Sequence, residues 1–401
     1  MTTLPQAPVR LAVCSVLLAA SAGVSAQTTQ VTTNDQFLPD DAKPAQKAPP
    51  HKSMTVGKTT VTVKGYIKLD AMVTDYDAYP TASLEPLGRD YYAGPRSVPL
   101  DDGSGGVTVY DMHAKQTRLI VGTETPLENG ETVKTHLEVD FNNSDAGNET
   151  ISNSYQPRLR QAFITYGNWL FGQTWSTFQN VGALPETLDF IGPAESTVFI
   201  RQPMVRYTAG NFQIAVENPE SRIAGDTTTD DNTLPDVALR WNAGPLVLAG
   251  LIRSVESQDP AGVDDSAVGG GVSVSGKFKV GARDDLKFMA TAGSGLGRYV
   301  GVISNFDANV DAGGDIDLID STAGYIAYRH FWTPKTRSSL VYGMFDGDGD
   351  VETASSVHVN LLHSVTPSLT TGIEFMHAER EMATGAEGAF DRVQFSAKYA
   401  Y

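Results

Sequence analysis

The period of the hydrophobic pattern restricts the fold of this chain more than any other feature. In residues 60–73 the apolar side chains occupy the odd positions, and mostly polar side chains occupy the even ones. Residues 390–401 repeat this alternation and end on an aromatic residue, Tyr401. Because successive side chains of an extended strand point to opposite faces, a period of two predicts a strand with one apolar and one polar face. The sequence therefore predicts amphipathic β-strands at both ends of this region.

Connections between the predicted strands are of two kinds. Tight turns, such as residues 167–168 and 209–211, alternate with long loops at 75–111, 176–198 and 299–320. A soluble β-sandwich also has alternating strands, but it packs the apolar face into a core and has short loops at both ends. Short turns on one rim and long loops on the other are typical of bacterial outer-membrane barrels. This asymmetry favours an all-β fold, a transmembrane antiparallel β-barrel in the outer membrane.

The breaks in the pattern give the number of strands. Predicted strands begin near Thr60, Met112, Glu131, Pro157, Trp169, Phe199, Phe212, Pro235, Leu246, Ala267, Asp285, Ser321, Arg337, Glu352, Leu369 and Phe390. We expect about sixteen strands, an even number that leaves both chain ends in the periplasm. Aromatic residues beside the short turns are Trp169, Phe171, Tyr207, Phe212, Trp241, Trp332 and Tyr401. They predict a girdle at the lipid interface, although strands also favour aromatic residues in general.

The amino-terminal residues predict export. Arg10 precedes an apolar run at residues 11–20, and small residues lead up to a cleavage position after Ala26. The run is too short for a membrane anchor, which needs about 20 apolar residues. We expect residues 1–26 to be a cleaved signal peptide, which removes the single cysteine, Cys14.

The rest of the chain divides into a leader and a barrel domain. Residues 27–57 are rich in Thr, Gln, Pro and Lys without a helical or strand period, so we expect a flexible periplasmic segment. Residues 58–401 are the predicted barrel. Its longest near-continuous apolar run, residues 244–252, is far shorter than a spanning helix, so strands must make any membrane crossing. The net charge of −17 argues against a nucleic-acid partner.

The sequence offers no recognisable enzyme chemistry. Its seven histidines form no pair at the helical spacing of metal ligands, and no glycine loop is followed by Lys and then Ser or Thr. The acidic residues 346–352 resemble a calcium loop, but Val357 stands where the twelfth-position glutamate would be. We therefore predict no cofactor, no metal site and no catalytic residue.

The polar faces of the strands carry more basic than acidic residues. The inward basic residues are Lys64, Lys68, Arg118, Lys134, Arg158, Arg160, Arg206, Arg240, Lys277, Lys279, Lys287, Arg329, Arg392 and Lys398. The inward acidic residues are Asp70, Glu124, Glu138, Asp140, Glu217 and Glu374. Basic side chains along a narrow passage concentrate anions. Arg158 and Arg160 share a parity, so they either select anions or brace the barrel by pairing with loop carboxylates, and the two roles are compatible.

A long loop at residues 176–198 is predicted to fold into the barrel. It carries apolar residues such as Phe178, Leu188 and Phe190, which a loop surrounded by water would have less reason to contain. Folded inward, it would place its acidic residues opposite the arginines. Those acidic residues are Glu186, Asp189 and Glu195.

The strand that returns from this loop carries two further arginines. Arg201 and Arg206 fall on opposite parities. Both can face the pore only if Pro203 marks a β-bulge.

Several segments resemble the DcaP-like porin family. They are PRLRQAFITYG at residues 157–167, FGQTWSTF at 171–178, FIRQPMVRY at 199–207 and YRHFW at 328–332, together with the aromatic last strand. The resemblance extends from about residue 65 to the end of the chain. It implies a sixteen-stranded homotrimeric porin, with the third loop folded into each pore and a basic eyelet that favours organic anions such as dicarboxylates. The eyelet positions that it implies are Arg158, Arg160, Arg201 and Arg206.

We therefore expect passive diffusion of small hydrophilic solutes, with a preference for organic anions. In addition to the eyelet, Arg118 joins the constriction, and the lumen is lined by Lys64, Lys68, Lys134, Arg240, Arg392 and Lys398. The other expected partners are outer-membrane lipid and the barrel-assembly machinery, since the aromatic terminal strand looks like the signal that such machinery reads. Residues 27–57 lack the heptads of the coiled-coil extension that some family members carry, so trimers would rest on the barrel walls. The alternative is a barrel that its loops close and that has a surface-binding or structural role.

Overall fold

The structure is a computed structural model that describes residues 52–79, 87–103, 105–142, 152–225, 232–258, 263–302, 304–311 and 313–401. All of these belong to one compact unit, Asn34–Tyr401. The predicted signal peptide and residues 27–51 lie outside the described residues. Within the described part of the chain, no helix combines the length and the apolar character that a bilayer crossing requires.

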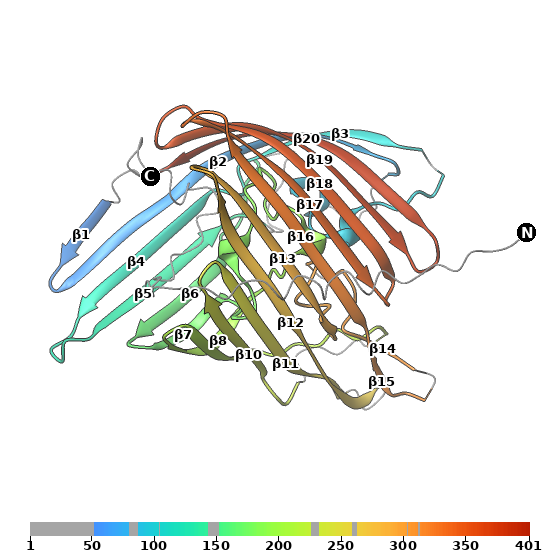
Figure 1. The fold of residues 1–401 in the computed structure, drawn as a ribbon, viewed down its shortest axis with the longest axis horizontal. Coiled ribbons are helices and arrows are strands. Elements are labelled where there is room, and N and C mark those ends of the chain that lie inside the picture. Colours follow the sequence, from blue (N-terminus) through green and yellow to red (C-terminus); the bar gives the residue numbers. More distant parts are fainter. Residues whose placement is uncertain are drawn as a thin grey trace, which may run out of the picture. The chain divides into compact units, whose positions relative to one another are not determined.

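A closed antiparallel barrel of 16 wall strands dominates the fold (Figure 1). The wall strands are β2 (Thr59–Tyr76), β3 (Val107–His113) continued by β4 (Arg118–Pro126), β5 (Thr132–Asp140), β6 (Arg158–Tyr166), β7 (Trp169–Trp175), β8 (Arg201–Ala209), β9 (Phe212–Glu217), β10 (Asp236–Ala243), β11 (Leu246–Gln258), β12 (Asp264–Val280), β13 (Asp284–Ser294), β16 (Asp320–Phe331), β17 (Thr336–Gly347), β18 (Val351–Ser364), β19 (Leu369–Met382) and β20 (Glu387–Ala400). Since β3 and β4 pair with successive halves of β2, they count as one wall strand. The barrel closes where β20 pairs with β2, with Val393 opposite Val73. The predicted fold class and strand number are confirmed.

One further strand comes from the segment that the sequence predicts to be flexible. β1 (Lys52–Val56) forms a hairpin with β2, with Met54 opposite Val61. The reason lies at the other end of the chain. β20 ends at Ala400, and Tyr401 exchanges two backbone hydrogen bonds with Gly65, so the first residues of β2 have no partner from β20. β1 covers that edge, which would otherwise expose unpaired backbone groups.

The side chains follow the predicted parity. On β2, Ile67 is 58% exposed on the outer face, whereas the neighbouring Lys68 is buried inside. Aromatic residues at the short-turn rim are exposed on the outer face, namely Trp169, Phe171, Phe212, Trp241, Trp332 and Tyr401. Some of them stack across strands, as Phe212 does on Trp241 with 5.9 Å between ring centroids. This is the position expected for an aromatic girdle at the membrane interface.

Three long loops at the opposite rim carry the remaining elements. The first loop (77–106) contains α1 (Leu87–Asp90) and the 3-10 helix η4 (Pro95–Ser97). The third loop (176–200) contains η5 (Val181–Ala183) and η6 (Ala194–Ser196). The sixth loop (295–319) contains β14 (Ala308–Val310) and β15 (Ile316–Leu318), which pair with each other. Long loops belong to the extracellular side of bacterial barrels, so these three mark the outer mouth.

Candidate functional site

The third loop is packed inside the barrel as the sequence predicts. Every residue of 176–198 is buried except Val181 and Gly182. Phe190 clusters with Tyr91 and Tyr92 of the first loop and with the inner wall.

The other end of the third loop packs against the sixth loop. Phe178 lies against Tyr299, with ring centroids 6.0 Å apart in an edge-to-face arrangement. The third loop is thus held from both sides by apolar contacts, which explains the apolar residues in its sequence.

Wall cations hold the backbone of the third loop. Lys68 donates to the carbonyl of Leu188 at 2.8 Å, and Lys287 donates to the carbonyl of Leu184 at 2.7 Å. Arg240 donates in the same way to the carbonyl of residue 179, also at 2.7 Å. All three cations belong to the predicted basic lumen. Here they satisfy loop carbonyls that would otherwise be buried without hydrogen bonds.

Glu186 attaches the third loop to β16 and β17. Its carboxylate accepts two hydrogen bonds from Arg337, at 2.8 and 2.6 Å, and one from Arg329 at 3.0 Å. All three side chains are buried. Burial opposes ionisation, but the two guanidiniums outweigh it and hold the pKa of Glu186 well below its usual range. Arg337 is absent from the predicted lumen set because it directly follows a turn, where no alternation precedes it.

The other two acidic residues of the third loop have different roles. Asp189 accepts hydrogen bonds from the backbone N–H groups of Tyr92, at 2.9 Å, and Ile191, at 3.1 Å. Glu195 accepts one from Ser356 Oγ at 2.8 Å. Burial raises the pKa of both carboxyl groups, and these hydrogen bonds reduce the effect. Asp189 therefore joins two loops, and Glu195 joins the loop to β18.

The expectation that these acids face Arg158 and Arg160 is wrong. Both arginines pair with carboxylates of the wall strand β5. Arg158 donates to the two oxygens of Asp140 at 2.8 and 2.9 Å, and Arg160 bridges Glu138 at 2.6 Å and Asp140 at 2.9 Å. Arg118 lies 3.2 Å from Glu138. These pairs brace the wall at β4, β5 and β6.

A β-bulge explains how Arg160 reaches both carboxylates. β6 inserts Arg160 as an extra residue opposite the step from Glu138 to Val139 of β5. A bulged residue redirects its side chain relative to the regular pleat.

The condition set for Arg201 and Arg206, a β-bulge at Pro203, is not met, since the pairing of β7 with β8 runs through Pro203 without a shift of register. Arg201 instead reaches the neighbourhood of Arg160 from the first residue of β8, where both guanidiniums lie over the ring of Trp175, at 4.7 and 5.9 Å.

Arg201 completes this group, which we call the arginine cluster: Arg118, Arg158, Arg160 and Arg201 with Glu138 and Asp140. Arg160 and Arg158 are the strongest charged neighbours of Arg201. Its guanidinium lies 4.7 Å from the ring of Trp175, and its Nη1 atom is buried without a hydrogen-bond partner. Among the described residues, no carboxylate oxygen lies within 4.0 Å of it. Arg201 is thus held by an aromatic ring in place of an ion pair.

The remaining predicted pore residues are dispersed. Arg206 is buried and donates to the carbonyl of residue 175 at 2.5 Å. Near the short-turn rim, the Lys134 side chain is 49% exposed and Lys64 is half-buried. Arg392 donates to a threonine of β2 at 2.7 Å, and Lys398 lies 4.2 Å from a tyrosine ring. These residues line the inner wall but do not join the arginine cluster.

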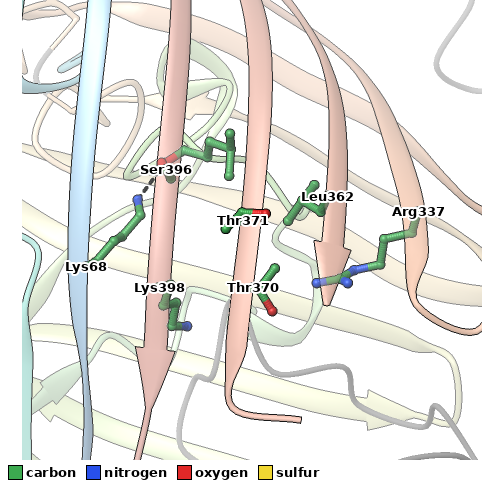
Figure 2. Close-up of a pocket in the computed structure, with 8 residues that line it drawn as sticks. Lys68, Arg337, Leu362, Thr370, Thr371, Ser396 and Lys398 are labelled. Carbon is green, nitrogen blue, oxygen red and sulfur yellow. Dashed lines mark hydrogen bonds between the residues drawn. The ribbon is translucent and has the colours of Figure 1, made fainter. Parts of the chain in front are cut away.

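A small pocket lies where the third loop meets the short-turn half of the wall (Figure 2). Its lining residues are Lys68, Leu188, Arg337, Leu362, Thr370, Thr371, Ser396 and Lys398. Figure 2 shows Lys68 reaching from β2 toward β20, and Arg337 reaching from β17 toward β18. Since both cations bind the loop, this pocket borders its anchor.

One inner-wall glycine makes room for the third loop. A Cβ atom at Gly343 of β17 would overlap Glu195 Oε1 and Ser196 Oγ and lie 2.6 Å from Pro193 Cβ. Gly343→Ala should therefore push η6 away from the wall, cost about 1–3 kcal/mol of stability and change the single-channel conductance. Gly250→Ala is the matched control, since a Cβ there has open space. Equal conductance of the two variants would contradict this packing role.

Comparison with known proteins places the chain in a family. The model of the DcaP outer membrane protein family matches residues 45–401. The chain belongs to the DcaP outer membrane protein family. A search of curated proteins gave no match. In the part of this DcaP family member that the structure describes, no group of three His, Cys, Asp or Glu side chains could hold a metal ion.

Solved structures agree with the DcaP fold. The outer membrane channel DcaP of Acinetobacter baumannii matches with a TM-score of 0.70 at 24% identity, over 86% of this chain and 99% of that one. The anion-selective porin from Comamonas acidovorans matches with a TM-score of 0.52 at 12% identity, over 86% of this chain and 100% of that one. OmpF of Salmonella typhi matches with a TM-score of 0.52 at 9% identity, over 87% of this chain and 100% of that one. At these identities the likeness is one of fold. This DcaP family member is an outer-membrane porin and not an enzyme.

Proposed function

We propose that this porin passes small organic anions, such as dicarboxylates, by passive diffusion with a preference for anions. The observation that carries the proposal is the charge of the arginine cluster. Four guanidiniums face two carboxylates, and Arg201 has no carboxylate partner among the described residues. Surplus positive charge beside a narrow passage of low dielectric constant lowers the barrier for anions and raises it for cations. The similar porin from Comamonas acidovorans is described as anion-selective.

Reversal potentials in a KCl gradient test this proposal. The wild-type pore should show an anion-selective potential. Arg201→Gln should reduce the permeability ratio of chloride to potassium by about threefold, since a screened charge near the path contributes about 0.6 kcal/mol. Arg283→Gln is the control, because Arg283 is exposed in the turn between β12 and β13. A cation-selective wild type, or an Arg201→Gln pore with an unchanged potential, would refute the assignment.

We also propose a homotrimer. β3 has a register of paired residues with β2 along one edge, and none with a described strand along the other. On its outer face, Tyr110 and Met112 are exposed. Unpaired backbone in lipid is costly, so a neighbouring barrel wall would protect this edge. A similar porin, OmpT of Vibrio cholerae, is described in a trimer form. Native mass spectrometry of the detergent-extracted protein tests the assembly.

A closed barrel with a surface-binding role is the second candidate. The observation in its favour is the burial of nearly the whole third loop between the first and sixth loops. Bilayer recordings separate the two functions. Correctly inserted protein that conducts no ions would support the closed barrel and end the porin proposal.

A further inference from the structure

A second buried arginine without a carboxylate partner lies near the outer mouth. Arg380 is on the inner face of β19, opposite Gly388 of β20, and is 9% exposed. Its Nε atom has no hydrogen-bond partner. Among the residues that the structure describes, no carboxylate oxygen lies within 4.0 Å of it. An unpaired charge in such a place is unfavourable unless a counter-charge arrives from solution.

The first-loop segment that packs against β19 beside Arg380 carries a second positive charge. η4 of the first loop contacts β19. Its residue Arg96 is the strongest charged neighbour of Arg380. Arg96 lies 5.2 Å from the ring of Phe306 and donates to Asp350 at 3.2 Å. The Asp350 side chain is 50% exposed, so water screens it. Among the described residues, the one carboxylate that pairs with either of these two guanidiniums is therefore solvated, and it pairs with Arg96.

Other acids of this region are engaged elsewhere. The phenol of Tyr92 has both Glu195 and Arg380 among its charged neighbours. Glu195 accepts its hydrogen bond from Ser356 on β18. Glu379, one residue before Arg380, is exposed on the outer face and pairs with Ser355 there. None of these carboxylates neutralises Arg380.

We propose that Arg380, assisted by Arg96, is a docking site for the carboxylate group of small organic anions at the outer mouth of the pore. Guanidinium groups offer planar, paired donors that fit a carboxylate. The site lies on β19 and the first loop, whereas the arginine cluster lies on β4, β5, β6 and β8. Arg380 lies two residues before the end of β19 at the long-loop rim, the side from which an external solute enters. This proposal rests on the proposed function, because it concerns the solutes of the same pore.

Block of chloride current by malonate tests the site. With KCl on both sides of a planar bilayer, malonate is added first to one compartment and then to the other. The wild type should be blocked at lower malonate concentration from one side, the outer mouth. Arg380→Gln should raise the half-blocking concentration from that side about tenfold, the loss expected for one charged hydrogen bond, and leave the other side unchanged. Arg380→Lys should give an intermediate value, since it keeps the charge but loses the planar fork.

Control measurements separate this site from the arginine cluster. Arg283→Gln removes a positive charge at the opposite rim and should keep wild-type block from the outer side. Heat-modifiable gel migration verifies that each variant is folded. Absence of block in the wild type, or equal block of wild type and Arg380→Gln, would overturn the site. A cation-selective pore that still loses side-dependent block in Arg380→Gln would overturn the proposed function and keep the site.

Discussion

Replacing Glu186 by glutamine should release the third loop from β16 and β17 and lower the free energy of unfolding by about 3–5 kcal/mol. The carboxylate of Glu186 bridges two buried guanidiniums, Arg329 and Arg337. Asp285 remains as a partner of Arg329, but Arg337 keeps only its hydrogen bond to Ser364. The other contacts of the loop remain, but the segment around residue 186 is then free to move away from β16 and β17, which widens the passage beside it, so the single-channel conductance should rise. Bilayer recordings and the urea midpoint of the detergent-solubilised barrel measure the two effects.

Glu128→Gln is the matched control for this substitution. Glu128 lies in the short turn between β4 and β5, and its side chain is 94% exposed. Surface charges of this kind contribute little to stability. The control should therefore behave like the wild type. Wild-type conductance together with a wild-type urea midpoint in Glu186→Gln would exclude the anchoring role.

Acid should reproduce the effect of this substitution. The pKa of Glu186 is held below its usual range in the folded barrel, so its contribution is complete above the unfolded pKa of about 4.3. The contribution is lost as the pH falls through the folded pKa. Glu195 and Asp189 have raised pKa values, so their contribution is complete below the unfolded pKa and is lost as the pH rises through the folded value. In Glu186→Gln the loss of stability on the acid side should be smaller than in the wild type.

The fold could be predicted from the sequence because one physical rule repeats along it. Each strand of a barrel in lipid must place apolar side chains outside and polar ones inside, as Ile67 and Lys68 do. A period of two is visible without any knowledge of neighbouring strands. β1 could not be predicted because its five residues are too few to show a period. It also forms only because β20 ends before it reaches the first residues of β2, which no local pattern reveals.

The electrostatic partners could not be predicted in the same way. Parity shows that Arg158 faces inward, but the choice between Asp140 and Glu186 depends on register, bulges and the path of the loop. A one-residue bulge at Arg160 places Gln161 opposite Glu138 and leaves Arg160 hydrogen-bonded to both Glu138 and Asp140. Arg380 also falls on the inward parity of β19. Its lack of a partner becomes visible only when the neighbouring strands and the first loop are in place.

Replacing Arg160 by methionine should distinguish bracing from selectivity within the arginine cluster. Arg160 is buried and bridges Glu138 and Asp140, so its loss leaves each of these buried carboxylates with one arginine. The free energy of unfolding, measured from the urea midpoint, should fall by about 3 kcal/mol. Lys134→Met, which removes an exposed charge, is its control.

Arg201→Gln should give the opposite pattern. Arg201 has no ion pair among the described residues, so its removal should change the reversal potential while the urea midpoint stays close to that of the wild type. An Arg160→Met barrel as stable as the wild type would show that the wall does not depend on this bridge. In that case Arg160 would belong with the residues whose positive charge sets the ion selectivity. The pair of variants thus assigns each arginine to the wall or to the pore by two independent measurements.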